Sequence, residues 1–371
     1  MDPLRRSEEE PRQFGFDTRQ VHAGQRPDPN TGARAVPIFQ TTSYVFEDPE
    51  SAAAYFNLQE YGNTYSRIMN PTVAVFEERM ANLEGGCGAV AFASGIAAQA
   101  AALFTLLQPG DHVVSSSALY GGTVNQFKHL LRKMNVALTW VDPDDLDAWR
   151  AALRDNTKAC YGETIGNPGG NVLDIETIAS LAHERGIPLI VDNTFATPYL
   201  CRPMEWGADI VVHSATKFLA GHDDALVGAV VCKRPDDTAR LLEFRSRTGP
   251  VTNADTAWLL LRGLATLEVR VARQTDSAMV LVERLRTHPA VEVVRYPGFG
   301  GLMSFDVTGD ARAVETSTRL IENATSLGGV DSVLETRYRW EGDRVPENLI
   351  RLSVGLEDVD ALWADLEQAL A

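Results

Sequence analysis

Short apolar runs alternate with amphipathic segments along the middle of the chain, from residue 88 to residue 232. The runs predict strands, and the segments, whose apolar residues recur every three or four positions, predict helices. Strands are expected at 89–93, 112–116, 136–141, 159–163, 188–192, 209–213 and 226–232, and helices at 95–107, 124–134, 146–153 and 175–185. This order is typical of a parallel sheet with crossover helices, so the pattern predicts an α/β fold around a mainly parallel central sheet.

Two further regions flank this sheet. After it, a leucine-rich helix is expected over 254–285, then strands near 291–295, 301–307 and 349–354 and a closing helix from about Val359. Before Gly85 the chain is expected to be mostly loop, because Pro27-Asp28-Pro29-Asn30 and Asn70-Pro71 are turn signals. We therefore expect an N-terminal arm and intersubunit segment (1–62), a larger α/β domain (63–248) that holds the ligand, and a smaller C-terminal α/β domain (249–371).

The charge of the chain narrows its range of partners. The formal net charge is −16, and a surface this acidic repels nucleic acid and anionic membranes. No apolar run approaches the ~18–20 residues of a membrane span, and residues 1–10 lack the apolar core of a signal peptide. We expect a cytoplasmic protein with a disordered N-terminal tail, which binds a small substrate through local positive groups.

The cysteines do not predict a metal or redox site. Cys87, Cys160, Cys201 and Cys232 are widely spaced and form no C-x-x-C pair, so apolar packing is the favoured interpretation. The histidines also lack metal-ligand spacing near carboxylates or thiols. No metal is predicted.

Polar residues follow the expected strands at their carboxyl ends, the edge at which such sheets bind ligands. Asp192 ends one strand, and Ser214-Ala215-Thr216-Lys217 follows another. A lysine can hold an aldehyde as a Schiff base, and a carboxylate can keep a pyridine nitrogen protonated so that the ring acts as an electron sink. The combination predicts a clamp for pyridoxal 5'-phosphate, and hence an enzyme of amino-acid chemistry.

Nearby residues suit the same cofactor. Ser94-Gly95-Ile96 joins a strand to a helix, so it forms either an anion site for the phosphate or a simple helix cap. Ser214 and Thr216 flank the lysine with hydroxyls that can bind a phosphate. Tyr120 can stack on the pyridine ring or is an aromatic turn residue.

Five blocks of sequence carry a resemblance to a known family. They are Tyr65-Ser66-Arg67-Ile68-Met69-Asn70-Pro71-Thr72, Ala93-Ser94-Gly95-Ile96-Ala97-Ala98, Val191-Asp192-Asn193-Thr194-Phe195-Ala196-Thr197-Pro198, His213-Ser214-Ala215-Thr216-Lys217 and Arg351-Leu352-Ser353-Val354-Gly355. On these blocks the chain, from about Thr18 to its end, resembles the pyridoxal-phosphate enzymes of Cys/Met metabolism, the trans-sulfuration family. The resemblance implies an aspartate-aminotransferase-like, fold-type I structure.

The resemblance also implies roles for matched positions. Lys217 resembles the Schiff-base lysine and proton shuttle, and Tyr120 the stacking residue, and both are expected to be catalytic. Ser94, Gly95, Ile96, Asp192, Thr194, Ser214 and Thr216 resemble the remaining cofactor-binding residues of one subunit. Tyr65 and Arg67 resemble the pair that reaches the phosphate of a neighbouring subunit, which implies a homodimer, commonly paired into a tetramer.

A substrate site is implied as well. Arg351 resembles the residue that binds the α-carboxylate of an amino acid, assisted by Asn167 and the backbone around Ser326. Asp331 stands where related enzymes often carry a glutamate thought to contact the distal amino group of a cystathionine-type substrate. Such enzymes act on amino acids with a leaving group on the γ or β carbon, which a thiol replaces or which is lost with formation of 2-oxobutyrate.

Subfamily features divide between the two halves of the chain. Residues 21–25, 32–38, 56–60 and 162–168 resemble motifs of O-acetylhomoserine sulfhydrylases, whereas 221–225 and 326–332 look more like cystathionine γ-lyases and γ-synthases. The leading hypothesis is γ-replacement on an O-acylhomoserine with sulfide or a small thiol, and the alternative is γ-elimination or γ-synthesis with cystathionine or a related amino acid. A methionine γ-lyase is less favoured, because those enzymes often carry a cysteine where Gly122 stands.

Two alternatives concern the chain more broadly. A non-catalytic relative that serves as a binding or regulatory module is disfavoured by Lys217, Asp192, Tyr120 and Arg351. The segment 335–346 departs from both subfamilies, and its three arginines, Arg337, Arg339 and Arg344, predict either an acidic substrate or a surface loop.

Overall fold

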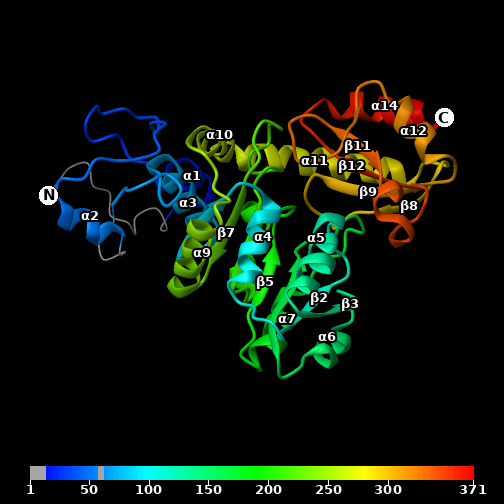
Figure 1. The fold of residues 1–371 in the computed structure, drawn as a ribbon. Coiled ribbons are helices and arrows are strands. Elements are labelled where there is room, and N and C mark those ends of the chain that lie inside the picture. The colour runs from blue at the N-terminus through cyan, green and yellow to red at the C-terminus, as the bar shows by residue number, and fades with distance from the viewer. Residues whose placement is uncertain (1–13, 57–61) are drawn as a thin grey trace.

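Figure 1 shows the protein as a computed structural model, which describes residues 14–56 and 62–371. Two sheets with their helices are joined by the long helix α11 (Leu267–Arg286), and the N-terminal helices lie beside the larger sheet. The expected tail at 1–10 and residues 57–60 of the sulfhydrylase-like block lie outside the described residues.

The larger sheet has seven strands in the order β1-β7-β6-β5-β4-β2-β3. They are β1 (Gly88–Phe92), β2 (His112–Ser116), β3 (Ala137–Val141), β4 (Thr157–Glu163), β5 (Leu189–Asp192), β6 (Ile210–Ser214) and β7 (Gly228–Cys232). Every pair is parallel except those made by β7, which runs antiparallel to both β1 and β6. The mainly parallel sheet is confirmed, and the last expected strand, at 226–232, begins at Gly228 and runs in the opposite direction to the others.

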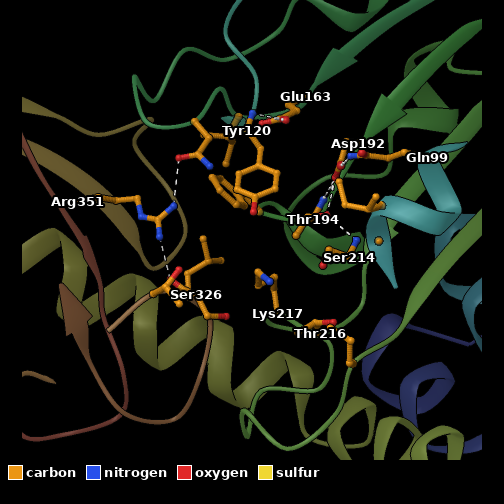
Figure 2. A pocket seen from close by; sticks show the side chains of 18 of the residues that line it. Gln99, Tyr120, Glu163, Asp192, Thr194, Ser214, Thr216, Lys217, Ser326 and Arg351 are labelled. Atoms are coloured by element: carbon orange, nitrogen blue, oxygen red, sulfur yellow. Dashed lines mark hydrogen bonds between the residues drawn. The ribbon is translucent and has the colours of Figure 1, made fainter. Parts of the chain in front are cut away.

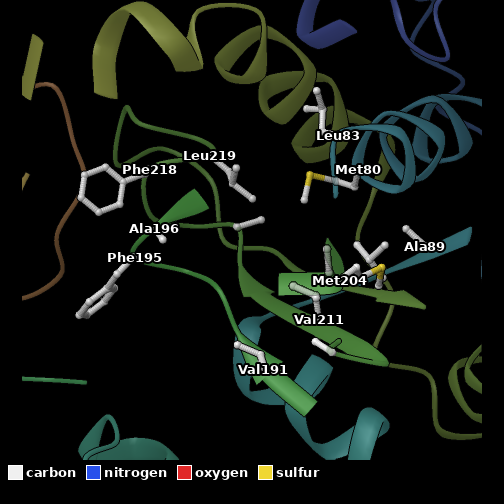
Figure 3. Close-up of a cluster of buried hydrophobic side chains, with 14 of the residues drawn as sticks. Met80, Leu83, Ala89, Val191, Phe195, Ala196, Met204, Val211, Phe218 and Leu219 are labelled. Carbon is white, nitrogen blue, oxygen red and sulfur yellow. The ribbon is translucent and has the colours of Figure 1, made fainter. Parts of the chain in front are cut away.

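Helices cover both faces of this sheet because its strands are apolar on both sides. In β1, Ala91 packs in the cluster that holds Phe76 of α3, while Phe92 packs with Ala102 of α4 on the other face. Figure 3 shows part of the first cluster. One face carries α3 (Pro71–Glu84), α6 (Leu146–Ala152), α7 (Ile175–His183) and α10 (Ala254–Leu264), and the other α4 (Gly95–Phe104), α5 (Gly121–Gln126), the π-helical turn η2 (Phe127–Leu131) and α9 (Pro235–Thr248).

The smaller sheet has five strands in the order β10-β11-β12-β9-β8. They are β8 (Val291–Arg295), β9 (Leu302–Val307), β10 (Glu322–Asn323), β11 (Val333–Thr336) and β12 (Leu349–Ser353). The core between this sheet and its helices holds Leu281 of α11, Val314 of α12 (Ala311–Ser317) and Leu366 of α14 (Val359–Leu370). Because α11 also places Leu267 in a core cluster of the larger sheet, it fixes the two sheets relative to one another.

The region before Gly85 is more helical than the sequence predicted. It contains α1 (Phe16–His22), α2 (Pro49–Phe56) and the 14-residue α3. Asn70-Pro71, interpreted as a turn, is the start of α3: the Asn70 side chain accepts hydrogen bonds from the N–H groups of Thr72 and Val73, and Pro71 occupies the first turn. An N-cap asparagine followed by proline initiates a helix as readily as it initiates a turn, so the loop prediction was wrong here.

The expected helix over 254–285 is two helices, because the chain breaks between α10 and α11. Thr266 leaves the helical conformation, with φ −125° and ψ 17°. The buried Arg270 guanidinium donates to the carbonyls of Gly263 and Phe218, both at 2.8 Å. The Arg270 side chain thus satisfies a backbone carbonyl at the end of α10. The spacing of apolar residues is the same on both sides of the break, so the sequence pattern did not reveal it.

Shorter elements complete the chain. The expected helix over 124–134 starts earlier, at Gly121, and its second half is the η2 turn. The short helices α8 (Thr197–Leu200) and η3 (Pro203–Trp206) follow β5, and α13 (Tyr338–Glu341) and η4 (Gly342–Arg344) follow β11.

Candidate active site

A pocket of about 290 Å³ lies where the carboxyl ends of β5 and β6 meet the start of α4 and residues of the smaller-sheet region. Figure 2 shows its side chains. Most of the residues proposed from the sequence line it, namely Gly95, Ile96, Tyr120, Asn167, Asp192, Thr194, Ser214, Thr216, Lys217, Ser326 and Arg351. The fold therefore brings together residues that are more than 250 positions apart in the chain.

Asp192, the last residue of β5, is buried and held by three donors. Its Oδ1 accepts hydrogen bonds from the N–H and the hydroxyl of Thr194, at 3.0 and 2.5 Å, and its Oδ2 accepts from the amide of Gln99 at 2.9 Å. The Thr194 hydroxyl in turn accepts from the Ser214 N–H at 2.8 Å, which links the ends of β5 and β6. This carboxylate therefore has a fixed orientation at the carboxyl end of β5.

The start of α4 lies against Ser214. A Cβ added at Gly95 would come within 2.6 Å of the Ser214 Cβ, so only glycine permits this approach. The N–H groups of Gly95 and Ile96 lie in the first helical turn, where no intrahelical acceptor exists. The Ser94 side chain accepts from the N–H of Ala97 at 3.2 Å and does not line the pocket, so its hydroxyl acts as a helix cap, one of the two roles expected.

Thr216 lines the pocket, but its hydroxyl is already used. It donates to the carbonyl of Val227 at 3.3 Å and accepts from the N–H of the same residue at 3.0 Å. The sequence did not foresee this pairing, which ties the segment before Lys217 to the start of β7. No side-chain hydrogen bond engages the Ser214 hydroxyl among the described residues, so Ser214 has the freer of the two hydroxyls.

Lys217 lies in the same pocket, between the strand ends and Arg351. Burial lowers its pKa below that of an ordinary lysine, and the positive charge of Arg351 lowers it further, while the carboxylates of Asp223 and Asp192 act in the opposite direction. A lysine with a lowered pKa exchanges protons more readily near neutral pH, as a base or nucleophile must.

Tyr120 points its ring into the pocket from the loop after β2 (Figure 2). Its N–H donates to Glu163 at 2.7 Å, which anchors this loop to the end of β4. A Cβ at Gly122 would lie 2.3 Å from Tyr120 Cε1, so the ring occupies the space that a side chain at 122 would need. Burial raises the pKa of the Glu163 carboxyl well above its usual range, and the nearby Asp192 adds to the effect.

Arg351 lies across the pocket from Asp192, on β12 of the smaller sheet. Its guanidinium donates to Asn167 Oδ1 at 3.2 Å and to the Ser326 carbonyl at 2.9 Å, the two partners expected from the sequence. Ser326 takes a φ of +81°, which turns its carbonyl toward the arginine. Burial lowers the pKa of Arg351 to about 10, and the neighbouring Arg337 charge adds to the effect.

The end of β11 and the segment after it form an internal chain of ion pairs with Arg351. Glu335 Oε1 accepts from Arg351 at 2.5 Å and from Arg337 at 2.7 Å, and Arg337 also donates to Glu341 at 2.6 Å. Glu341 then accepts from Arg344 at 2.7 Å. We call these five residues the ion-pair chain.

The surface-loop interpretation fits two of the three arginines, because Arg339 and Arg344 are exposed. Arg337 is 4% exposed and lines the pocket, so the surface-loop interpretation was wrong for it. Each of Arg337, Arg339 and Arg344 is also paired with a buried glutamate, Arg339 with Glu315. The segment therefore does not present three unpaired positive charges to an acidic substrate.

Besides Ser94, three of the proposed site residues do not line the pocket. Tyr65 and Arg67 line a separate hollow beside residues 251–254, where Arg67 donates to the carbonyl and hydroxyl of Ser246. Asp331 is exposed and lies near Asp223. Burial raises the pKa of Asp223, the Asp331 carboxylate raises it further, and Lys217 opposes both.

Sequence reasoning missed several residues of the pocket. Gln99 and Glu163 line it alongside the proposed residues. Gln99 sits one helical turn after the Ser94-Gly95-Ile96 block, so its place on the first turns of α4 was an available signal. Glu163 ends a predicted strand beside Asp192, which was a second signal.

The donor set fits pyridoxal 5'-phosphate. Two N–H groups at the first turn of α4, beside the hydroxyl of Ser214, suit a phosphate, and the fixed Asp192 carboxylate suits a protonated ring nitrogen. Lys217 lies in the same pocket to hold the aldehyde. Within residues 14–56 and 62–371, no helix is long and apolar enough to cross a membrane, and no group of three acids, histidines or cysteines is placed to hold a metal ion.

Comparison with known proteins gives full-length matches. The profile of a family described as Cys/Met metabolism PLP-dependent enzyme matches residues 17–371. An O-acetyl-L-homoserine sulfhydrylase of Leptospira meyeri is 36% identical and aligns with 97% of each chain, and an L-methionine gamma-lyase of Pseudomonas putida is 40% identical over 96% of this chain and 97% of its own. The solved structure of a Campylobacter jejuni protein described as an O-acetylhomoserine (thiol)-lyase, which carries N'-pyridoxyl-lysine-5'-monophosphate, superimposes with a TM-score of 0.92 at 34% identity, over 96% of this chain and 99% of that one.

Proposed function

Because the chain belongs to the Cys/Met metabolism family of PLP-dependent enzymes, we propose that it catalyses γ-replacement on an O-acylhomoserine. Sulfide or a small thiol displaces the acyl group, so that O-acetylhomoserine and hydrogen sulfide would yield homocysteine and acetate. The observation that carries the proposal is that Lys217, Asp192 and Arg351 line one pocket. The full-length similarity to an O-acetyl-L-homoserine sulfhydrylase supports the choice of acyl substrate.

Lys217 moves the protons in this account. Bound pyridoxal 5'-phosphate supplies an electron sink that stabilises negative charge next to the reacting carbons. The Lys217 amine takes the proton from the substrate Cα and delivers it again, a task for which its lowered pKa suits it. Gln99 and Thr194 hold the Asp192 carboxylate in one orientation, in which it would serve a protonated ring nitrogen of the bound cofactor.

Arg351 orients the substrate. Its charge and paired donors suit an α-carboxylate, and its bonds to Asn167 and the Ser326 carbonyl fix the plane of the guanidinium. With the carboxylate held there, the Cα proton faces the Lys217 side of the pocket. The Tyr120 ring packs over the same space and limits how far the substrate can tilt.

Assembly and location are part of the proposal. Tyr65 and Arg67 lie away from the pocket of their own chain, which supports a role at the site of a neighbouring subunit in a homodimer. Two such dimers would form the tetramer expected from the family resemblance. We keep a cytoplasmic location as the expectation that goes with a metabolic enzyme.

One assay tests the reaction. The cofactor-loaded enzyme is incubated with O-acetylhomoserine, with and without sulfide, and homocysteine and 2-oxobutyrate are quantified in the same samples. The proposal predicts homocysteine that depends on sulfide and little 2-oxobutyrate. Equal 2-oxobutyrate in both samples would contradict it.

The second candidate is γ-elimination. The 40% identity with an L-methionine gamma-lyase favours it, as does the resemblance of residues 221–225 to cystathionine γ-lyases. It predicts 2-oxobutyrate without any added nucleophile. L-methionine and cystathionine, each supplied alone, extend the same assay to this candidate.

A further inference from the structure

We propose that Arg337 is a positioning residue for the substrate carboxylate. It shares Glu335 with Arg351 and thereby weakens the ion pair between Glu335 and Arg351, so that an incoming carboxylate can take the place of Glu335 on Arg351. The inference rests on the proposed function only in so far as the substrate is an amino acid held through Arg351. Arg337 itself would not touch the reacting atoms.

The geometry of Glu335 carries the first step. One oxygen of this carboxylate, Oε1, accepts from both guanidiniums, at 2.5 Å from Arg351 and 2.7 Å from Arg337. A carboxylate that is shared by two cations binds each of them less strongly than one that serves a single cation, because its one negative charge is divided between them. Glu335 therefore competes with a substrate carboxylate for Arg351, and Arg337 weakens this competition.

Charge balance carries the second step. The ion-pair chain alternates Arg351, Glu335, Arg337, Glu341 and Arg344, with three positive and two negative groups. Its four buried members, two arginines and two glutamates, balance one another, and the third positive charge lies on the exposed Arg344. Because charges act strongly on one another where water is excluded, a substrate carboxylate that takes the place of Glu335 on Arg351 leaves Glu335 with Arg337 as its cationic partner.

The far end of the ion-pair chain shows how Arg337 is itself held. Glu341 binds Arg337 through Oε1 and Arg344 through Oε2. Arg344 also donates to the carbonyl of Leu119, at 3.0 Å, directly before Tyr120. The chain thus runs from the carboxylate site to the loop that carries the stacking ring.

Arg337 keeps one unused donor at the pocket. Its Nε is buried and has no hydrogen-bond partner among the described residues, although both terminal nitrogens are bound to glutamates. The guanidinium is therefore fixed by two carboxylates at the wall of the pocket.

Removing Arg337 should change carboxylate binding specifically. In Arg337→Gln, Glu335 would have Arg351 as its only cationic partner, and a substrate carboxylate would have to displace it. We expect amino acids to bind about tenfold more weakly. The cofactor should stay bound, because the residues proposed to hold it, Gly95, Asp192 and Ser214, are not hydrogen-bonded to Arg337. In the double variant Glu335→Gln, Arg337→Gln the competitor is gone as well, so binding should return to within about threefold of the wild type.

The experiment is a titration of the cofactor-loaded protein, followed by the absorbance of the bound cofactor. Two ligands without a leaving group are compared: L-norvaline, which has a carboxylate, and L-norvalinol, which has the same amine and chain but no carboxylate. Arg337→Gln should raise the Kd of norvaline and leave that of norvalinol unchanged. Arg339→Gln is the matched control, because Arg339 belongs to the same segment, pairs with Glu315 and does not line the pocket.

Several results would overturn the inference. They are an equal loss for both ligands, a double variant as weak as Arg337→Gln, or the same loss in Arg339→Gln. If Arg337→Gln does not fold, Glu335→Gln decides: it should bind norvaline at least as tightly as the wild type, and weaker binding would refute the competition. Because no turnover is involved, the pattern can hold even if the γ-replacement assay gives no homocysteine.

Discussion

The two walls of the pocket are built in different ways. The cofactor wall consists of Gly95, Asp192, Ser214 and Lys217, which stand at strand ends and a helix start and are fixed mainly by hydrogen bonds. The carboxylate wall consists of Arg351 and the rest of the ion-pair chain, which is held by charge pairs between side chains. The first wall follows from the topology of the sheet, whereas the second depends on a few charged residues in one segment.

This difference teaches where specificity can change. A strand end cannot move without disturbing the sheet, so the cofactor wall leaves little freedom to its residues. An ion-pair chain can be rebuilt by substituting a few residues of an ordinary loop, with no change of fold.

The largest expected effect belongs to the cofactor wall. Lys217→Ala should lower turnover by roughly 10³-fold or more, because the base and the covalent anchor for the cofactor are lost together. Product formation and the absorbance of the bound cofactor measure both losses. Lys233→Ala, which removes an exposed lysine, should change neither. Turnover that persists in Lys217→Ala would show that the cofactor wall does not supply the catalytic base.

Removal of Arg351 tests the opposite wall. Arg351→Gln should raise KM for the amino acid by roughly 10- to 100-fold, because hydrogen bonds to a charged group are lost, while the affinity for the cofactor stays unchanged. Steady-state kinetics and cofactor titration separate these quantities. Exposed Arg312 on α12, changed to Gln, serves as the control. A variant that loses cofactor together with substrate affinity would show that the two walls are not independent.

Tyr120 stands between the walls, and Gly122 makes room for its ring. Gly122→Ala places a Cβ that would lie 2.3 Å from Tyr120 Cε1, so the ring must shift. We expect kcat/KM to fall about tenfold, as a small misplacement of a contact residue commonly causes. At Gly309 a Cβ meets nothing within 4 Å, so Gly309→Ala should behave as wild type. An unchanged rate in Gly122→Ala would mean that the ring position is not critical.

The smallest expected effect is a pH dependence of stability at Glu163. Burial, and then Asp192, raise the pKa of this carboxyl, so its contribution to stability is complete below its unfolded pKa and is lost as the pH rises through its folded pKa. The wild type should therefore lose stability relative to Glu163→Gln between pH 5 and pH 8, with the Tm difference changing by roughly 1–3 °C. Thermal unfolding at both pH values measures this. Glu367→Gln, at an exposed site, should show no such trend, and a Tm difference for Glu163→Gln that is equally flat would contradict the assignment.

The sequence predicted that Asp192, Ser214 and Lys217 lie together at one edge of the sheet, and the structure brings them into one pocket. Asp192 and Lys217 follow apolar runs, and such runs place their ends at one edge of a parallel sheet. Ser94 is the exception in detail, because its hydroxyl caps α4. Gln99 was missed because it reaches Asp192 across 93 residues of sequence, and periodicity does not report such a contact.

The carboxylate wall was harder to predict. The sequence contains Glu335, Arg337 and Glu341 at spacings that suit either a solvated helix or a buried chain of pairs, and only the fold decides which charges meet. Similar reasons explain the two errors in the fold. Asn70-Pro71 initiates a helix as well as a turn, and the break before α11 depends on a bond from Arg270 to the carbonyl of Gly263.

The most direct test of the two-wall account is a crystal structure of the cofactor-loaded enzyme with L-norvaline bound. We predict the cofactor phosphate at the first turn of α4 beside Ser214, and the norvaline carboxylate on Arg351, with Glu335 still bound to Arg337. A carboxylate held by another cation, or a phosphate away from α4, would contradict the account.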